Sequence, residues 1–452
     1  MACYEGISDR TLWWSSKKVD MFDGAPFRLN EYMSSSRFEA ITAALRLTDR
    51  PYPTDFQDRF HEVRQCIEAF NDHYSEKYDP SWLSCLDESM NVWLDKYCPG
   101  FMVVPRKPHE KGNEYHTICD GDEGRPILWR MELVEGKDRP KKGSAWAFPC
   151  EFEQEGITKT PALMLRMTKP IHGQGKVVSM DSGFCVSLGC THMKKRGVYG
   201  QALIKKRKYW PKYVPGPHII DHFKDKELGT TETYKQTLDG EEFFVHCYRD
   251  DKYVCKMMSC HGLLDKVADH KTARRVNGAW KSFHYAEPFS RHNHSKHWVD
   301  DHNNRRHDPI SLDDTWKTKH WPMRQFTFTL AVAEVNACNA RARGRKRPAE
   351  PQLDFRKKLA KLMLQNTLGE DTEPAGMSLR GRASLNGDIH QLVKRQKYEG
   401  AWDNTTQSFA KTKQKYQKSN CAKCGKRCRT YCACNKSVCL CVECFANHKP
   451  TA

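Results

Sequence analysis

The last 32 residues combine cysteine and histidine at the spacing of a metal site. They hold eight of the chain's 20 cysteines, and a histidine lies near their end, at His448. Tetrahedral Zn²⁺ needs thiolates and imidazoles two to four residues apart, because one tight turn must present two ligands to one ion. A segment this short cannot bury a core, so the metal would have to fold it. Seven to nine candidate ligands indicate two zinc ions.

A disulfide knot is the alternative for this segment. It would need an oxidising compartment, and the N-terminal residues have no apolar core of a signal peptide. The other cysteines are scattered through the chain, as reduced intracellular thiols are. No apolar run approaches the roughly 18 residues of a membrane span. We therefore expect zinc, an intracellular protein and no membrane segment.

Three aspartates stand where a mixed α/β core would hold them rigidly and still expose them. Asp87 lies in the strand-like SCLDESM, Asp181 ends the apolar KVVSMD, and Asp300 lies at the start of a helix in HNHSKHWVDDHNN. Carboxylates so placed suit two Mg²⁺ or Mn²⁺ ions, which can activate a water or a 3′-hydroxyl and stabilise the leaving oxygen of a phosphodiester. Taken singly, an aspartate at such a place is more often a turn former or an N-cap.

The positive charge lies at the C-terminal end of the chain. The net charge is +18, of which residues 341–420 carry +10 and residues 421–452 carry +5. This placement predicts a polyanion partner, most simply nucleic acid, although a basic tail can also merely aid solubility. RGRKRP at 343–348, with Arg345, Lys346 and Arg347, is a candidate for nuclear import or for phosphate contact.

Hydrophobic periodicity predicts a mixed α/β chain. Helices are expected within 1–80, with Ser34 to Ser36 as N-cap candidates and apolar core stripes on both helices. Short apolar segments after Trp82 read as strands, including ALMLRM at 162–167. A β-rich insertion follows, helices return from 285, and 366–418 reads as a disordered basic linker. P-loop, Rossmann and nucleophile-elbow motifs are absent, which disfavours nucleotide-dependent and serine-hydrolase functions.

The order of several motifs resembles the piggyBac transposase family from about residue 5 to the end. MSSSRFEAITAALRLTD resembles its N-terminal helical signature. CLDESMNVW, followed by VVPRKPHEKGNEYHTICD, resembles its first catalytic aspartate strand and the strand pair after it. VVSMDSGF resembles the second aspartate motif, HNHSKHWVDDHN the third, and HWPMR the Trp-Pro helix that follows. The Cys-rich end is similar to the family's cross-brace zinc finger.

The resemblance implies an α/β fold with an RNase H-like catalytic core. It implies catalytic carboxylates at Asp87, Asp181 and Asp300, which bind two Mg²⁺ or Mn²⁺ ions. It also implies cut-and-paste transposition at TTAA sites through a hairpin intermediate, on double-stranded DNA, by a homodimer in the nucleus. Trp321 matches a position that contacts DNA, beside the basic Arg345, Lys346 and Arg347. The implied ligands of two Zn²⁺ ions are Cys421, Cys424, Cys432, Cys434, Cys439, Cys444 and His448.

The resemblance also implies the order of the domains. A helical dimerisation and DNA-binding domain comprises 1–80 and 304–365, and the catalytic core comprises 81–204 and 284–303. The expected insertion, linker and zinc finger are 205–283, 366–418 and 419–452.

Several features depart from the family pattern. Asn303 stands where the family usually has a further aspartate, and a neutral amide binds a hard cation less well. Asp301 points about 100° away on a helix. Cys432 and Cys434 are separated by one residue rather than two, so Cys428 or Cys441 are alternative zinc ligands. The chain also begins almost at the helical signature, as a truncated or decayed element would.

Three functions therefore compete. The first is a DNA transposase with its three aspartates intact. The second is a domesticated or decayed derivative that binds DNA without cutting it, which Asn303 and the short N-terminus favour. The third is a RING-type ubiquitin ligase, whose zinc pattern is also a cross-brace but normally spreads over more residues than this segment offers.

Overall fold

The computed structural model forms two compact units, Met1–Ala360 and Lys361–Ala452, which are described separately. It describes residues 13–14, 29–52, 58–105, 107–121, 124–136, 151–205, 210–261, 271–276, 278–308, 310–316, 318–345, 350–365, 379–383, 389–394, 402–403, 408–409, 419–428, 430–432, 435–441 and 444. None of the helices built from these residues is long and apolar enough to cross a membrane.

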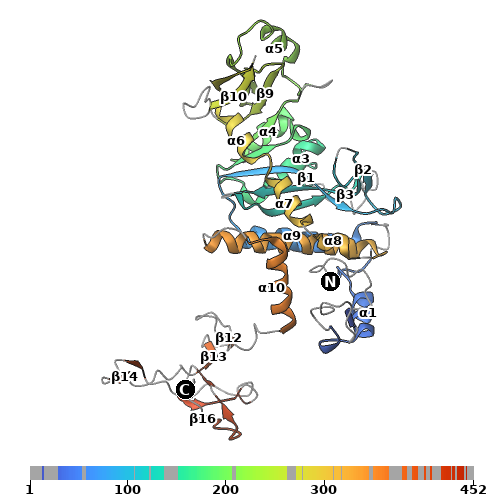
Figure 1. The fold of residues 1–452 in the computed structure, drawn as a ribbon, viewed down its shortest axis with the longest axis vertical. Helices are drawn as coiled ribbons and strands as arrows, with labels where there is room; N and C mark the ends of the chain where they lie inside the picture. The colour runs from blue at the N-terminus through green and yellow to red at the C-terminus, as the bar shows by residue number, and fades with distance from the viewer. Residues whose placement is uncertain are drawn as a thin grey trace. The chain divides into compact units, whose positions relative to one another are not determined.

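A mixed sheet forms the centre of the first unit (Figure 1). Its strands follow the order β2-β3-β1-β5-β6-β9-β8-β7, and β4 pairs with the same edge of β3 as β2 does. The pairs β1/β5 and β5/β6 are parallel and the others are antiparallel. The strands are β1 Leu83–Val92, β2 Phe101–Val103, β3 Lys111–Asp120, β4 Ile127–Leu133, β5 Val177–Met180, β6 Tyr199–Leu203, β7 Thr231–Leu238, β8 Glu241–Arg249 and β9 Val254–Ser259. The predicted α/β class is thus confirmed.

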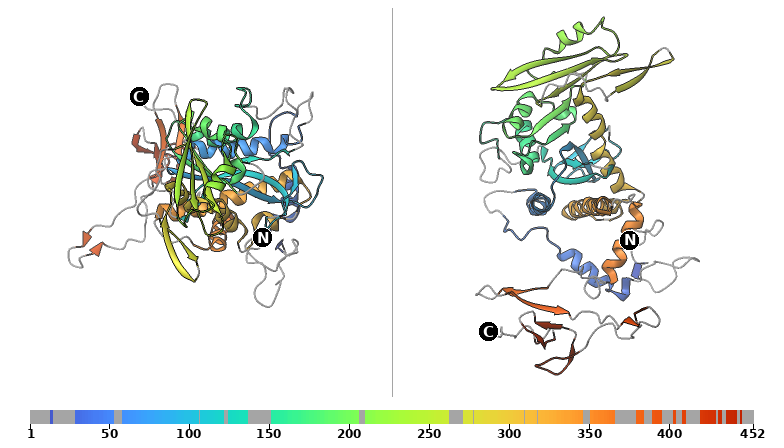
Figure 2. Two further views of the ribbon diagram at one scale, coloured as in Figure 1. Left: turned by 90° about the horizontal axis from the view of Figure 1, so that it is seen from above. Right: turned by 90° about the vertical axis from the view of Figure 1, so that its left-hand side faces the viewer.

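Helices cover both faces of this sheet and create two cores. Alternate residues of each strand point to opposite faces, so Leu86 and Val178 pack with α3 (Lys159–Thr168) and α4 (Ser187–Lys195). Cys85 and Val177 pack instead with α2 (His61–Lys77), α7 (Trp298–His307) and α9 (Trp321–Arg345). Figure 2 shows α2 and α9 side by side, seen nearly end-on in its right-hand view.

Side-chain amides fasten α9 to the strands. Asn336 donates to the carbonyl of Leu128 and accepts from its N–H, while Gln325 donates to Asn113 at 2.7 Å. All of these groups are buried, and a buried amide left unpaired would cost stability. The bonds therefore fix α9 in register with β3 and β4.

Two predictions about local structure were wrong. The segment at 162–167 belongs to α3 and not to a strand, and every residue from Pro161 to Thr168 is buried. A fully buried helix shows no apolar-polar alternation, so a short apolar run does not tell the two apart. Helix α1 (Ser35–Ala44) begins as expected at an N-cap, Ser34, but none of its residues is buried. Its stripe is not core within this unit; the stripe of α2, by contrast, buries Val63 and Phe70.

Strands also dominate the region after Lys205. Strands β7 to β9 continue the central sheet through the pairing of β9 with β6, and α5 (Gly216–His222) precedes them. Strands β10 (Lys271–Val276) and β11 (Ala279–His284) form a separate hairpin. The chain then returns through α6 (Glu287–Ser295) to α7, and α8 (Leu312–Thr315) precedes α9.

The second unit contains short strands. Its four-stranded sheet has the order β12-β13-β18-β19, and the pairs β14-β15 and β16-β17 are separate. Helix α10 (Gln352–Gln365) spans the boundary between the units. The sequence predicted an unstructured linker over 366–418; the described parts of this range instead form β12 to β15, and the rest lies outside the described residues. The strands are β12 Leu379–Ala383, β13 Ile389–Lys394, β14 Trp402–Asp403, β15 Ser408–Phe409, β16 Ser419–Asn420, β17 Arg427–Cys428, β18 Thr430–Cys432 and β19 Asn435–Cys439.

Gly121 lets the sheet approach the start of α7. A Cβ atom at this position would overlap the indole of Trp298, two residues before Asp300. Because overpacking a close contact costs roughly 1 to 3 kcal/mol, we expect Gly121→Ala to lower the free energy of unfolding by about that amount. Gly344→Ala is the control, since a Cβ there meets open space on α9 and helix propensity favours alanine. Chemical denaturation of both variants tests this; equal stabilities would contradict the tight contact.

Candidate active site

The three predicted aspartates lie on neighbouring elements of one sheet and its helix. Asp87 is in β1, Asp181 follows the last residue of β5, and Asp300 is in the first turn of α7. Strands β1 and β5 are parallel, with Leu86 paired with Met180. The next residue on each strand is therefore an aspartate, and the two lie side by side. The N–H of Asp181 reaches the carbonyl of Leu86 at 3.4 Å.

A buried thiol marks the point around which the three carboxylates gather. Burial raises the pKa of Cys85 well above its ordinary value, and the charges of Asp87, Asp300 and Asp181 raise it further, in that order. Cys85 also hydrogen-bonds with the backbone of Val299, which ties the start of α7 to β1. Cys85 and Asp87 lie two residues apart and thus on the same face of the strand. The sheet and α7 therefore place all three carboxyl groups within electrostatic range of Cys85.

Asp87 has a strongly perturbed carboxyl group. Burial raises its pKa to about 7; the charges of Glu88 and Asp181 act in the same direction, while the N–H of Glu88 and the ammonium of Lys107 oppose them. Lys107 donates to the carbonyl of Glu88 at 3.2 Å. A carboxyl group held in this way near neutrality is typical of a functional site. A bound cation would favour its ionised form.

Lys205 occupies part of the site that the sequence did not predict. Its ammonium donates to Oδ1 of Asp181 at 2.8 Å. Asp300 is exposed, and the three aspartates do not form a group in which one oxygen from each lies within 4.8 Å of the others. Three carboxylates, one within β1, one directly after β5 and one at the start of α7, nevertheless fit hard divalent cations by their chemistry. Lys205 follows β6, the parallel neighbour of β5, and this strand order could have predicted it.

Asn303 lies one helical turn after Asp300 and is half-buried. Residues three apart share a helix face, so the amide can reach the region that Asp300 faces. Asp301 is exposed and lies about 100° around the helix from Asp300.

Trp321, which the family resemblance matches to a position that contacts DNA, is buried in the core of this structure. Its side chain is 8% exposed, it packs edge-on against Phe60, and its indole N–H donates to Asn113 at 2.9 Å. In this conformation the indole holds the start of α9 against the sheet and is not displayed on the surface. Of the predicted basic group, Arg345 ends α9 but its side chain is not described, and Lys346 and Arg347 lie outside the described residues.

A second candidate metal centre lies in the second unit. One sulfur from each of four cysteines lies within 4.8 Å of the others: Cys421, Cys424, Cys441 and Cys444. Hydrogen bonds with the backbone of Cys441, Cys424 and Lys423 lower the pKa of Cys421 to about 6, which favours the thiolate that zinc binds. No described cysteine forms a disulfide. Four thiols in one group are compatible with a tetrahedral zinc site.

This group contains three of the predicted ligands, Cys421, Cys424 and Cys444, together with the alternative ligand Cys441. Cys439 is not part of it and packs with Cys421, Cys428 and Leu440. The repeated C-x2-C spacing, at 421–424 and again at 441–444, carried this information in the sequence. The side chain of Cys432 is not described, and Cys434 and His448 lie outside the described residues.

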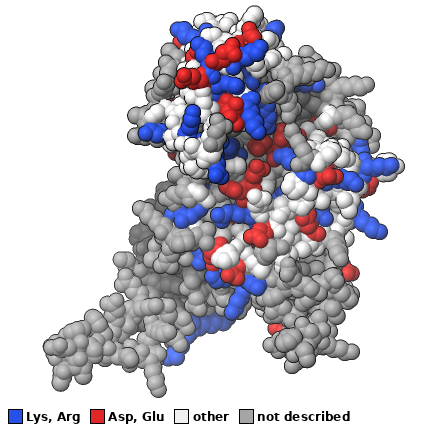
Figure 3. Space-filling model, turned by 45° about the horizontal axis from the view of Figure 1, so that its top comes forward, with Lys and Arg blue, Asp and Glu red and all other residues white. Residues whose placement is uncertain are grey.

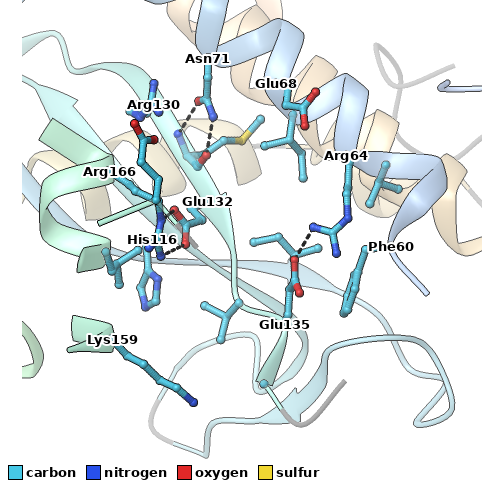
Figure 4. Close-up of a pocket in the computed structure, with 18 of the residues that line it drawn as sticks. Phe60, Arg64, Glu68, Asn71, His116, Arg130, Glu132, Glu135, Lys159 and Arg166 are labelled. Atoms are coloured by element: carbon cyan, nitrogen blue, oxygen red, sulfur yellow. Dashed lines mark hydrogen bonds and ion pairs between the residues drawn. The ribbon is translucent and has the colours of Figure 1, made fainter. Parts of the chain in front are cut away.

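A prominent pocket of the first unit is separate from the three aspartates. Its volume is about 650 Å³, and α2, α3 and the edge strand β4 line it (Figure 4). Its charged groups pair with one another: Arg64 with Glu135, and Arg166 with Glu132. None of the three aspartates lines it. On the face that Figure 3 shows, acidic side chains gather in a central hollow bordered by lysine and arginine.

Comparison with known proteins gives the family. The family described as Transposase IS4 matches residues 1–338, which is more than half of the chain. The chain belongs to this transposase family. Its fold is similar to the piggyBac transposase solved in a synaptic complex with hairpin DNA, with a TM-score of 0.55 and 16% identity over 88% of this chain and 78% of that one. The resemblance noted in the sequence is thus confirmed. No curated protein matches the chain.

The raised pKa of Asp87 predicts a pH-dependent stability. Burial raises the carboxyl pKa from an ordinary value of 3.8 to about 7. The stability that the protonated carboxyl group contributes to the folded state is therefore fully present below pH 3.8 and is lost as the pH rises through about 7. In metal-free buffer the free energy of unfolding of Asp87→Asn should therefore increase, relative to that of the wild type, by on the order of 2 to 3 kcal/mol between about pH 5 and about pH 8. Denaturant unfolding at the two pH values measures the difference. Asp301→Asn is the control; a pH-independent difference for Asp87→Asn would contradict the perturbed pKa.

The four-cysteine group predicts a shared loss of zinc. Cys421→Ser and Cys441→Ser should each remove the same ion, because a tetrahedral site missing one thiolate loses most of its affinity. The double variant should then contain no less zinc than either single variant, as elemental analysis of the full chain would show. A double variant that loses twice as much zinc would place the two cysteines in different sites.

Proposed function

We propose that this protein is a metal-dependent DNA transposase whose catalytic carboxylates are Asp87, Asp181 and Asp300. The observation that carries the proposal is the placement of these three groups near Cys85, with Asp87 and Asp181 at neighbouring positions of two parallel strands and Asp300 at a helix start. Membership of the Transposase IS4 family supports it, since such transposases use divalent metal ions. The strand order β4-β3-β1-β5-β6 supports an RNase H-like core. Strands β1, β5 and β6 are parallel to one another, and β3 is antiparallel to them.

The three aspartates would hold two Mg²⁺ or Mn²⁺ ions. When bound, such ions activate a water or 3′-hydroxyl and stabilise the leaving oxygen of the phosphodiester. The residues of the chain have separate tasks. Asp87 must lose the proton that its burial favours, and Lys205 must move from Asp181 or turn its ammonium toward a DNA phosphate. Cys85 and Val299 keep α7, and with it Asp300, against β1.

The similarity to the piggyBac transposase also supports a proposal for the DNA substrate. The piggyBac structure is a synaptic complex with hairpin DNA, which supports double-stranded DNA ends as the partner and a hairpin as an intermediate of this protein. We further propose TTAA as its target and a homodimer as its working form, with residues 1–80 and 304–365 as the dimerisation and DNA-binding part. The contact between α2 and α9 joins these two segments. The zinc segment at 419–452 would bind transposon ends.

The basic segment at 343–348 would serve nuclear import, with Arg345, Lys346 and Arg347 also available to phosphate. Nuclear localisation of this kind fits a protein whose substrate is chromosomal DNA. Fusion of this segment to a reporter would test it apart from cleavage.

A DNA-binding protein without cleavage activity is the second candidate. Asn303 favours it, because an amide replaces the further carboxylate of the family pattern on the face of Asp300. The ion pair of Lys205 with Asp181 favours it as well, since it competes with a cation for one carboxylate oxygen.

Cleavage of a labelled duplex with TTAA beside candidate transposon ends, in Mg²⁺ or Mn²⁺, separates the two candidates. The wild type should release nicked and hairpin products, and Asp181→Ala should lose them at least 100-fold while binding DNA with nearly unchanged affinity. Asp301→Asn should cleave like the wild type, because its side chain lies outside the site. Binding without cleavage by the wild type in either metal would contradict the transposase and favour the DNA-binding protein.

A further inference from the structure

Two histidines and an aspartate form a separate cluster beside α7. His109 comes from the loop between β2 and β3, His307 from the last turn of α7, and Asp314 from α8. One ligand atom of each lies within 4.8 Å of the others. The two imidazole rings are stacked, with centroids 4.2 Å apart and an interplanar angle of 26°. Three segments that are distant in sequence thus bring metal-binding groups together.

The distance between two of these ligand atoms is that of neighbours around a single ion. Nδ1 of His307 lies 3.3 Å from Oδ2 of Asp314. Zinc takes nitrogen and carboxylate oxygen at roughly 2.0 to 2.2 Å in a tetrahedral arrangement, which places neighbouring ligand atoms about 3.3 to 3.5 Å apart. Nδ1 of His307 is shielded from solvent, and the carboxylate of Asp314 is the partner that the described residues give it. A bound ion would take the imidazole nitrogen and the carboxylate together in place of this contact.

The nearest guanidinium does not oppose a cation strongly. Arg306 forms a buried ion pair with Asp313, which neutralises it. The cluster therefore offers one carboxylate and stacked imidazoles to any ion that enters it.

We propose that His109, His307 and Asp314 bind one divalent transition-metal ion of the zinc class. Two imidazoles and one carboxylate are a known ligand set for Zn²⁺, with the fourth position left to solvent. The proposal concerns neither the three catalytic aspartates nor the cysteines of the second unit, and it does not depend on the proposed function.

Such an ion would join a loop to the helix that carries Asp300. The loop is closed at its base, where the N–H of Val104 donates to the carbonyl of Glu110 at 2.7 Å. Lys107, within this loop, contacts Glu88 beside Asp87. The ion would therefore restrain Lys107 relative to the carboxylate site from a distance.

Metal content tests the proposal directly. Full-length wild type and the variants His109→Gln, His307→Gln and Asp314→Asn are saturated with Zn²⁺, freed of excess ion and analysed for metal per chain. Each variant should lose one equivalent relative to the wild type. His320→Gln is the matched control, since His320 is exposed on the segment before α9 and lies outside the cluster. Combining His109→Gln with Cys421→Ser should remove the equivalents of both sites.

A spectroscopic measurement covers the case in which a variant folds poorly. Co²⁺ added to metal-free Cys421→Ser protein should give a visible d–d band from nitrogen and oxygen ligands that is lost on adding His109→Gln. Wild-type metal content in all three cluster variants would overturn the proposal and leave a plain ion pair between His307 and Asp314. A lowered stability of the variants with unchanged metal content would overturn it in the same way.

Discussion

The parallel pairing of β1 with β5, together with the contact of β1 with α7, is the constraint on which the candidate site depends. Parallel strands in register put the residues that follow Leu86 and Met180 side by side, and both residues are aspartates. The third carboxyl group reaches them only because Trp298 and Val299 bury the start of α7 against the sheet. Gly121 leaves the space for that indole. A shift of α7 by one turn would move Asp300 by about 5.4 Å and separate the three groups.

The same packing that builds the site makes it electrostatically costly. Asp87 is half-buried beside Glu88 and Asp181, and only Lys107 and a backbone N–H offset this arrangement. Proteins retain such concentrations of like charge where a cation or a substrate compensates for them. Lys205 compensates for Asp181 in this structure. The site is therefore poised between an internal ion pair and a bound metal, and this balance separates an active transposase from a DNA-binding derivative.

The sequence predicted the features that follow from local pattern. Asp181 could be placed because a short apolar strand ends before a Ser-Gly turn, and Ser34 because a cap precedes an apolar stripe. Features that depend on distant packing could not be predicted. The bond from the indole of Trp321 to Asn113, 208 residues earlier, is one such feature. Segment 162–167 looked like a strand because a helix buried on all sides loses its periodicity. Cys441, by contrast, could have been placed in the four-cysteine group from the repeated C-x2-C spacing at 421–424 and 441–444.

Metal-directed cleavage of the polypeptide would show whether Asp87, Asp181 and Asp300 share one metal site. Fe²⁺ replaces Mg²⁺ at carboxylate sites, and with ascorbate and peroxide it cuts the backbone close to where it is bound. We expect cuts near Asp87, Asp181 and Asp300 in the wild-type chain. Mg²⁺ should suppress all three cuts, and all three should be lost together in Asp181→Ala. Cuts that occur only elsewhere, for example near His109 and His307, or cuts near one aspartate that persist without the other two, would contradict a shared metal site.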